Sequence, residues 1–148
     1  MKNVILIFMY LTGATLFTGD GLQTITEEIS LEGVWELEYA QLYEDGLPVE
    51  IIDNVNGYRQ VKMYSKGKVM WTRYDPSDPN EWFGYGSYVV KDGMLEEVLE
   101  FASGPMMKII DTTQVFRFKL VRYKESFQQI QIGNDGEPTD SETFKRIE

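Results

Sequence analysis

The sequence predicts an all-β domain, an antiparallel barrel or sandwich of about eight short strands. Apolar and polar residues alternate with a period of two in several short runs, as they do along strands that bury one face. Turns that contain glycine separate these runs at short intervals, and no long segment has the periodicity of a helix. The five prolines all fall between the runs, where they interrupt no strand: Pro48, Pro76, Pro79, Pro105 and Pro138.

The domain is predicted to begin with a short helical turn and a strand. Residues 24–27 (TITE) have the spacing of a capping box, which predicts a helical turn through Ser30. Residues 33–43 then alternate, and this places Trp35, Leu37 and Tyr39 on one face of the first strand.

Two hairpins and three further runs supply the remaining strands. Residues 65–67 (SKG) and 91–93 (KDG) are the turns of the two hairpins. The predicted strands lie at residues 58–64, 69–74, 82–90, 95–102, 115–120, 127–132 and 143–147. The segment 47–56 fits a strand, a loop or a short helix.

Residues 1–19 are predicted to be a signal peptide, followed by the barrel domain over residues 20–148. Lys2 supplies a positive start, and an apolar run follows over residues 4–11. Small residues then permit cleavage after Ala14 or near Gly19. The apolar run is too short to span a bilayer, so we expect a secreted or periplasmic protein without a membrane span. The alternative is an N-terminal strand or helix that packs on the domain.

Composition narrows the function. A formal net charge of −10 argues against nucleic acid and anionic lipid surfaces as partners. The chain contains no histidine and no cysteine, which excludes Ser-His-Asp and Cys-His catalysis, His-ligated haem and the common zinc sites. We therefore expect no cofactor and no enzymatic activity; carboxylates and tyrosines are the acids and bases that remain for catalysis.

Two loops collect oxygen ligands, over residues 75–81 (DPSDPNE) and 134–137 (NDGE). Neither has the spacing of a calcium-binding loop, and Asp, Asn, Pro and Gly are ordinary turn residues. We expect no metal site in either loop.

The first and last strands resemble those of a known superfamily. Gly33-Val34-Trp35, after a helical turn, is similar to the Gly-x-Trp signature that opens the first strand of lipocalins and fatty-acid-binding proteins. Arg146 stands where that superfamily tends to carry an arginine on the last strand. The resemblance implies an up-and-down, lipocalin-like barrel closed by pairing of the first and last strands. Arg146 would then lie on the Trp35 ring, a cation–π contact of about 1 kcal/mol.

The middle of the chain resembles a family of small secreted lipocalin-like bacterial proteins whose function is largely uncharacterised. The similar segments are residues 62–64, 69–75, 84–88 and 92–101. Val69, Tyr85 and Leu95 depart from the family pattern, which leaves the shape of a pocket open but not the fold.

One carboxylate is predicted to lie inside the barrel. Alternation from Met94 places Glu97 on the same face as Leu95, Leu99 and Phe101, while Glu96 points the other way. A buried carboxylate requires a cation or a hydrogen-bond donor. Three residues on central strands are candidate partners, because alternation along their strands could point their side chains into the barrel: Lys62, Arg73 and Tyr88.

Aromatic residues are expected to line the interior around this group, namely Trp71, Phe101, Phe116 and Phe118. Two interpretations of the interior remain open. The polar residues could orient the head group of a ligand in an apolar cavity. Alternatively, they could form an ion pair that fixes strand register within a filled core.

The function expected first is a non-enzymatic barrel that binds a small, partly apolar ligand inside. The alternative is an interaction module with a filled core that contacts an envelope protein or a glycan. Aromatic residues near loops and strand ends motivate this alternative: Tyr43, Tyr58, Trp82 and Tyr123.

Overall fold

The computed structural model describes residues 29–53 and 57–148, and these residues form nine strands and one short helix. The strands are β1 (Gly33–Glu44), β2 (Leu47–Asp53), β3 (Arg59–Ser65), β4 (Lys68–Tyr74), β5 (Trp82–Lys91), β6 (Met94–Ala102), β7 (Phe116–Arg122), β8 (Ser126–Ile132) and β9 (Pro138–Arg146). The helix α1 (Gly104–Ile110) lies between β6 and β7. The predicted signal peptide and residues 24–28 of the predicted helical turn lie outside the described residues; Ile29 and Ser30 belong to no helix.

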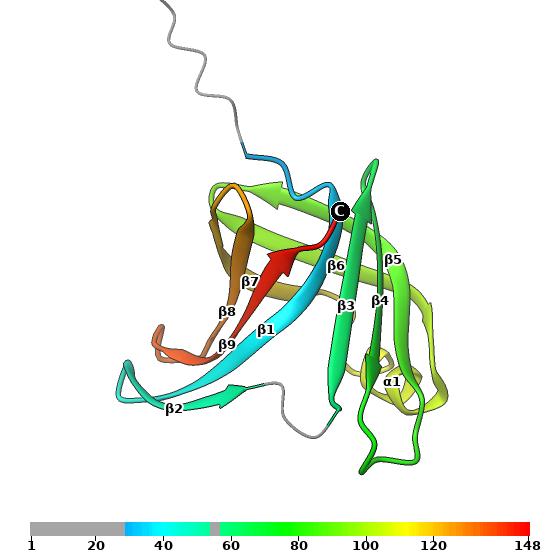
Figure 1. Cartoon of the computed structure of the whole chain (residues 1–148), viewed down its shortest axis with the longest axis horizontal. Helices are drawn as coiled ribbons and strands as arrows, with labels where there is room; N and C mark the ends of the chain where they lie inside the picture. Colours follow the sequence, from blue (N-terminus) through cyan, green and yellow to red (C-terminus); the bar gives the residue numbers. More distant parts are fainter. Residues whose placement is uncertain (1–28, 54–56) are drawn as a thin grey trace, which may run out of the picture.

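Strand β1 closes the barrel (Figure 1). It pairs with β3 over Gly33–Glu36 and with β9 over Trp35–Leu42, and each strand from β3 to β8 pairs with the next strand in the sequence. All these pairs are antiparallel. Because β1 pairs with both β3 and β9, the eight strands β1 and β3 to β9 form a closed ring. The predicted all-β antiparallel barrel is thereby confirmed. Strand β2 is a ninth strand outside the ring, paired to the far half of β1.

The two predicted hairpin turns are confirmed, and their backbone explains the sequence. Lys66 and Gly67 have φ of 47° and 76°, and Asp92 and Gly93 have φ of 52° and 75°. Two consecutive residues with positive φ are typical of a type I′ turn, whose twist matches that of the flanking strands. Glycine at the second position adopts this conformation without strain.

A β-bulge in β1 corrects one predicted face. Leu37 pairs with the fully buried Phe144, but Tyr39 pairs with Thr143, so Glu38 is an extra residue on β1. An extra residue reverses the alternation beyond it. The prediction that Tyr39 shares the inner face with Trp35 and Leu37 is therefore wrong, and Tyr39 lies on the outer face with Thr143.

Two elements were not specified by alternation. The segment 47–56, for which the sequence allowed a strand, a loop or a short helix, contains strand β2. All seven residues of β2 are exposed, so this strand has no buried face that an alternating pattern could reveal. Helix α1 spans only seven residues, starts at Gly104 and includes Pro105, which was assigned to a loop. Pro105 occupies the first turn of the helix, where its missing N–H costs nothing. Met106 is buried and anchors α1 to the barrel.

Strand β1 begins at the end of the barrel opposite α1 (Figure 1). Aromatic side chains pack together there. Trp35 is 1% exposed, its indole N–H donates to the Leu31 carbonyl oxygen at 2.7 Å, and Phe127 meets its ring edge-on. The Arg146 guanidinium lies 4.0 Å from the Trp35 ring centroid, as the resemblance to lipocalins implied. The same guanidinium donates to the Glu32 carbonyl oxygen at 2.8 Å, and this ties the last strand to the segment before the first.

The outer face of β3 to β6 carries a row of apolar side chains that we call the outer row. Cross-strand pairing joins Met63 to Met70, Met70 to Tyr85, and Tyr85 to Phe101. Met63, Met70 and Phe101 are each about half exposed, and the Tyr85 and Phe101 rings stack with centroids 5.1 Å apart. The outer row is therefore a contiguous apolar strip across four strands.

Candidate functional site

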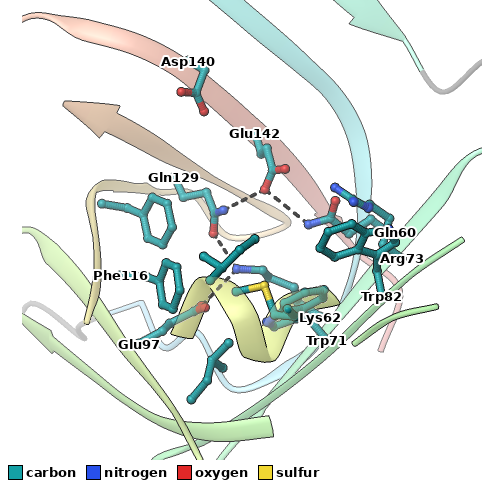
Figure 2. Close-up of a pocket in the computed structure, with 14 residues that line it drawn as sticks. Gln60, Lys62, Trp71, Arg73, Trp82, Glu97, Phe116, Gln129, Asp140 and Glu142 are labelled. Carbon is teal, nitrogen blue, oxygen red and sulfur yellow. Dashed lines mark hydrogen bonds and ion pairs between the residues drawn. The ribbon is translucent and has the colours of Figure 1, made fainter. Parts of the chain in front are cut away.

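A cavity of about 300 Å³ opens inside the barrel in the half that carries α1 (Figure 2). Side chains from the seven strands β3 to β9 and from α1 line it. They are Gln60, Lys62, Trp71, Arg73, Trp82, Glu97, Leu99, Met106, Ile109, Phe116, Phe118, Gln129, Asp140 and Glu142. The cavity thus combines an apolar wall with a group of charged and amide side chains, as small-molecule sites do.

Lys62 and Glu97 form a buried ion pair in the cavity wall. The Lys62 Nζ and Glu97 Oε1 atoms lie 3.0 Å apart, and both side chains are 4% exposed. The Tyr64 hydroxyl also donates to Glu97 Oε1, at 2.6 Å. The predicted burial of Glu97 and the prediction of Lys62 as its partner are both confirmed. A pair of this kind is stable only where further hydrogen bonds satisfy both groups, and Tyr64 provides one of them.

A chain of hydrogen bonds extends from this pair to a second carboxylate. Lys62 Nζ donates to Gln129 Oε1 at 2.8 Å, and Gln129 Nε2 donates to Glu142 Oε2 at 2.7 Å. Gln60 Nε2 donates to the same Glu142 oxygen at 3.3 Å, and the Tyr58 hydroxyl donates to Gln60 Oε1 at 3.0 Å. Figure 2 shows the links between Glu97, Lys62, Gln129, Glu142 and Gln60 as a continuous path along one side of the cavity.

Burial raises the pKa of Glu142 above its ordinary value of 4.5. The nearby charges of Asp140 and Glu97 raise this pKa further, while the Lys62 charge and the Gln60 hydrogen bond oppose the rise. Burial and the neighbouring Glu97 also raise the pKa of Tyr64 well above 10.0, so its hydroxyl stays a donor. Hydrogen bonds from neutral amides stabilise a carboxylate less than a cation in direct contact does, so the effect of burial prevails and the pKa of Glu142 is raised.

Arg73 and two tryptophans form the rim of the cavity on the β4–β5 side. The Arg73 guanidinium lies 4.4 Å from the Trp82 ring centroid, and Trp82 Nε1 donates to Asp78 Oδ2 at 2.7 Å. Arg73 Nε is buried and has no hydrogen-bond partner. Next to this rim, a Cβ on Gly84 would approach Trp71 Nε1 to 2.8 Å, so glycine there makes room for the Trp71 indole.

The apolar wall comes from β6, α1 and β7. Phe116 and Phe118 face inward, as their alternation with Arg117 and Lys119 predicted. Leu99 continues the wall along β6, and Met106 and Ile109 of α1 cover it from the open end.

Phe101 is not in the cavity, contrary to the prediction. It is 55% exposed and belongs to the outer row. In the β5–β6 pair, Tyr85 faces Phe101 while Gly86 faces Leu99, so Glu100 is an extra residue. This bulge reverses the alternation after Leu99 and turns Phe101 outward.

The other predicted partners of Glu97 lie elsewhere. Tyr88 pairs with Glu97 across the β5–β6 ladder but packs edge-on against the Tyr64 ring, with centroids 4.8 Å apart. It does not line the cavity. Arg73 lines the cavity but forms no ion pair with Glu97 among the described residues.

The aromatic residues that suggested an interaction surface are mostly covered. Tyr43, Tyr58 and Trp82 are half-buried, and Trp82 belongs to the cavity rim. Tyr123, at 58% exposure, is the exception.

The cavity residues that were not predicted include three members of the hydrogen-bond network. Gln60 stands two residues before Lys62, Gln129 two residues after Phe127, and Glu142 two residues before Phe144. Each therefore shares a face with a residue that the structure buries, but of these three neighbours only Lys62 was predicted to lie inside. Amide and carboxylate side chains are typical of outer faces, and the last strand was predicted to begin only after Glu142.

In the acidic loop over residues 75–81, Asp75 and Asp78 accept hydrogen bonds from nearby residues of the chain. Asp75 Oδ1 accepts hydrogen bonds from the Ser77 backbone N–H and hydroxyl, and these lower the pKa of Asp75. Hydrogen bonds from Asn80 and Trp82 lower the pKa of Asp78. Throughout residues 29–53 and 57–148, no three Asp or Glu side chains are grouped so as to hold a metal ion. Glu96 and Glu97 lie on opposite faces, with Glu96 bound to Arg117 outside.

Comparison with known proteins supports the fold. No family model and no curated protein matches the sequence. A solved structure of an uncharacterised protein from Bacteroides eggerthii is similar, with 18% identity over 79% of this chain and 99% of that chain and a TM-score of 0.51. A lipocalin-like protein from Bacteroides uniformis is 20% identical over 79% of this chain and 98% of that chain, with a TM-score of 0.51. Among residues 29–53 and 57–148, no helix has the length and apolarity to cross a membrane. Strand order, barrel closure and these neighbours together show that the chain has a lipocalin-like fold.

Proposed function

We propose that the protein is a secreted, non-catalytic barrel that binds a small, partly apolar ligand in the cavity between α1 and the Lys62–Glu97 pair. The cavity itself carries this proposal. Its volume of about 300 Å³ lies at the lower end of the range for small-molecule sites, and aromatic and aliphatic side chains form most of its wall.

The polar side of the cavity supports a ligand with one polar end. Glu142 and Gln129 are fixed by hydrogen bonds before any ligand enters. Groups that are already ordered lose little entropy on binding, so they orient a head group at low cost. The aliphatic part of the ligand would then lie against Leu99, Phe116 and Phe118.

Native mass spectrometry of purified protein, with an Ile109→Trp variant, tests this function. Ile109 lies on α1 at the cavity, and an indole there should obstruct it. Val98→Trp is the matched control, because Val98 is 41% exposed on the outside of β6 and Ile109 is 40% exposed. We expect a small molecule to accompany the wild type and Val98→Trp but not Ile109→Trp. Equal ligand content in all three proteins would contradict binding in this cavity.

A second candidate function, self-association through the outer row, is favoured by a separate observation. Met63 and Met70 form one half of the row, and Tyr85 and Phe101 form the other. A twofold axis at the centre would place each methionine on an aromatic ring of a second copy, a favourable sulfur–aromatic contact.

Charges beside the outer row also suit a second copy of the chain. They occur as the opposite-sign pairs Lys68–Glu100 and Arg59–Glu36. This face is therefore locally balanced in a protein of net charge −10, whose copies repel elsewhere. Sedimentation velocity over a wide concentration range should detect a dimer in the wild type that Met70→Lys abolishes. A monomer at every concentration would contradict this candidate.

A further inference from the structure

Charge balance in the cavity identifies the chemistry of the ligand's polar end, an inference that rests on the proposed function. Three carboxylates and two cations line the cavity. The carboxylates are Glu97, Asp140 and Glu142, and the cations are Lys62 and Arg73. Which charges already have partners decides which kind of head group the cavity can accept.

Lys62 has no donor left for a ligand. Its ammonium group carries three hydrogens. Three acceptors surround Nζ: Glu97 Oε1 at 3.0 Å, Gln129 Oε1 at 2.8 Å and the Tyr64 hydroxyl at 3.5 Å. Glu97 is the direct counter-ion of Lys62, so these two charges balance each other.

Arg73, the second cation, lies at the rim and forms no ion pair among the described residues. Its charge contributes only slightly to the lowered pKa of Asp75 and Asp78, which hydrogen bonds from Ser77 and Asn80 mainly cause. Its guanidinium also rests on the Trp82 ring. Its Nε atom is buried and has no hydrogen-bond partner among the described residues.

Glu142 and Asp140 remain without a cation. In the part of the chain that the structure describes, neither side chain takes part in an ion pair. The two hydrogen bonds to Glu142 come from neutral amides and both reach Oε2, while Oε1 accepts none among the described residues. Both side chains line the cavity from β9, two residues apart (Figure 2). Glu142 is partly buried, whereas Asp140 is exposed and accepts a hydrogen bond from the Thr139 hydroxyl at 2.9 Å.

We propose that the ligand is an amphipathic amine, whose protonated nitrogen binds Glu142 and Asp140 and whose apolar body fills the cavity. An ammonium group supplies the positive charge that these carboxylates lack, and donates charge-assisted hydrogen bonds to Glu142 Oε1.

Three probes that differ only in the head group test this proposal by isothermal titration calorimetry at neutral pH. They are octylamine, octanol and octanoate, which are cationic, neutral and anionic under these conditions. We expect octylamine to bind about tenfold more tightly than octanol, because charge-assisted hydrogen bonds are about twice as strong as neutral ones. Octanoate should bind least, because the uncompensated carboxylates repel it.

The variant Glu142→Gln identifies the group responsible. Its side-chain oxygen can still accept the Gln60 and Gln129 hydrogen bonds, so the network and the fold should persist. We expect octylamine to lose most of its advantage over octanol, while octanol binds as it does to the wild type. Glu50→Gln is the matched control, because it removes the same charge from an exposed residue of β2 away from the cavity.

The outcomes separate this inference from the proposed function. If octanol or octanoate binds as tightly as octylamine, the amine assignment is overturned, but ligand binding in the cavity stands. An octylamine advantage that survives in Glu142→Gln also overturns the assignment. If no probe binds and no molecule accompanies the purified wild type, the inference and the proposed function fail together.

Discussion

At the scale of single residues, two of the cavity's carboxylates, Glu97 and Glu142, have different kinds of partners. Glu97 receives a lysine and a tyrosine hydroxyl, whereas Glu142 receives two amides. A charge without a counter-ion in a partly dry interior reduces stability. Residues retained at such a cost are typical of functional sites, where stability and activity oppose each other.

Glu142→Gln should therefore stabilise the empty protein in a pH-dependent way. The folded pKa of Glu142 is raised, so its protonated form contributes stability that is complete below pH 4.5 and lost as pH rises through the folded pKa. The neutral glutamine keeps that contribution at high pH. We expect the variant to have a higher melting temperature than the wild type at pH 8, and the same melting temperature below pH 4.5. A variant less stable than the wild type at both pH values would contradict the unfavourable burial.

Glu97→Ala should have the opposite effect. It leaves the Lys62 ammonium buried without its counter-ion, which costs about 3–5 kcal/mol in comparable pairs. Chemical denaturation measures this loss. The double variant Lys62→Met/Glu97→Leu should recover most of the stability, because it removes both charges. Unchanged stability in Glu97→Ala would show that the pair is not maintained in solution.

At the scale of elements, alternation predicted the strands well and failed where a strand contains a bulge. The inward positions of Glu97, Phe116 and Phe118 follow from a period of two, and so does the confirmed partner Lys62. Tyr39 and Phe101 were assigned to the wrong face because one extra residue precedes each of them. A bulge depends on the neighbouring strand, so its position cannot be derived from the strand's own sequence.

The short elements were hidden for other reasons. Strand β2 has no buried face, and helix α1 is too short for a helical period to show. Glu142 was missed because a polar residue on a strand is normally solvated. Its inward direction is evident only once Phe144 is known to be buried in the same strand.

Closure of the barrel by β1 and β9 is testable by truncation. Removing residues 143–148 deletes Phe144, which is fully buried, and Arg146, which covers Trp35. We expect the truncated chain to be unfolded by circular dichroism. Trp35→Ala should reduce stability by about 3–5 kcal/mol, as other large-to-small core substitutions do. A truncated protein with the melting temperature of the full chain would contradict closure by β9.

At the scale of the whole molecule, our proposal requires that the protein is exported and that its signal peptide is removed. N-terminal sequencing of protein collected outside the cytoplasm should give a chain that starts after Ala14 or near Gly19. Cytoplasmic protein that is folded and retains Met1 would contradict the signal peptide.

The closed end of the barrel also determines how the molecule can be attached to something else. Both ends of the described domain meet there, because the Val34 N–H donates to the Glu148 carbonyl oxygen at 2.9 Å and the Ile147 N–H donates to the Val34 carbonyl oxygen at 2.8 Å. Helix α1 lies at the opposite end (Figure 1), and its Met106 and Ile109 line the cavity. A tether at either end therefore leaves the cavity mouth pointing away from its support. For the same reason, the two ends could be joined by a short linker and the chain reopened at the 91–93 turn, giving a circular permutant with the same cavity.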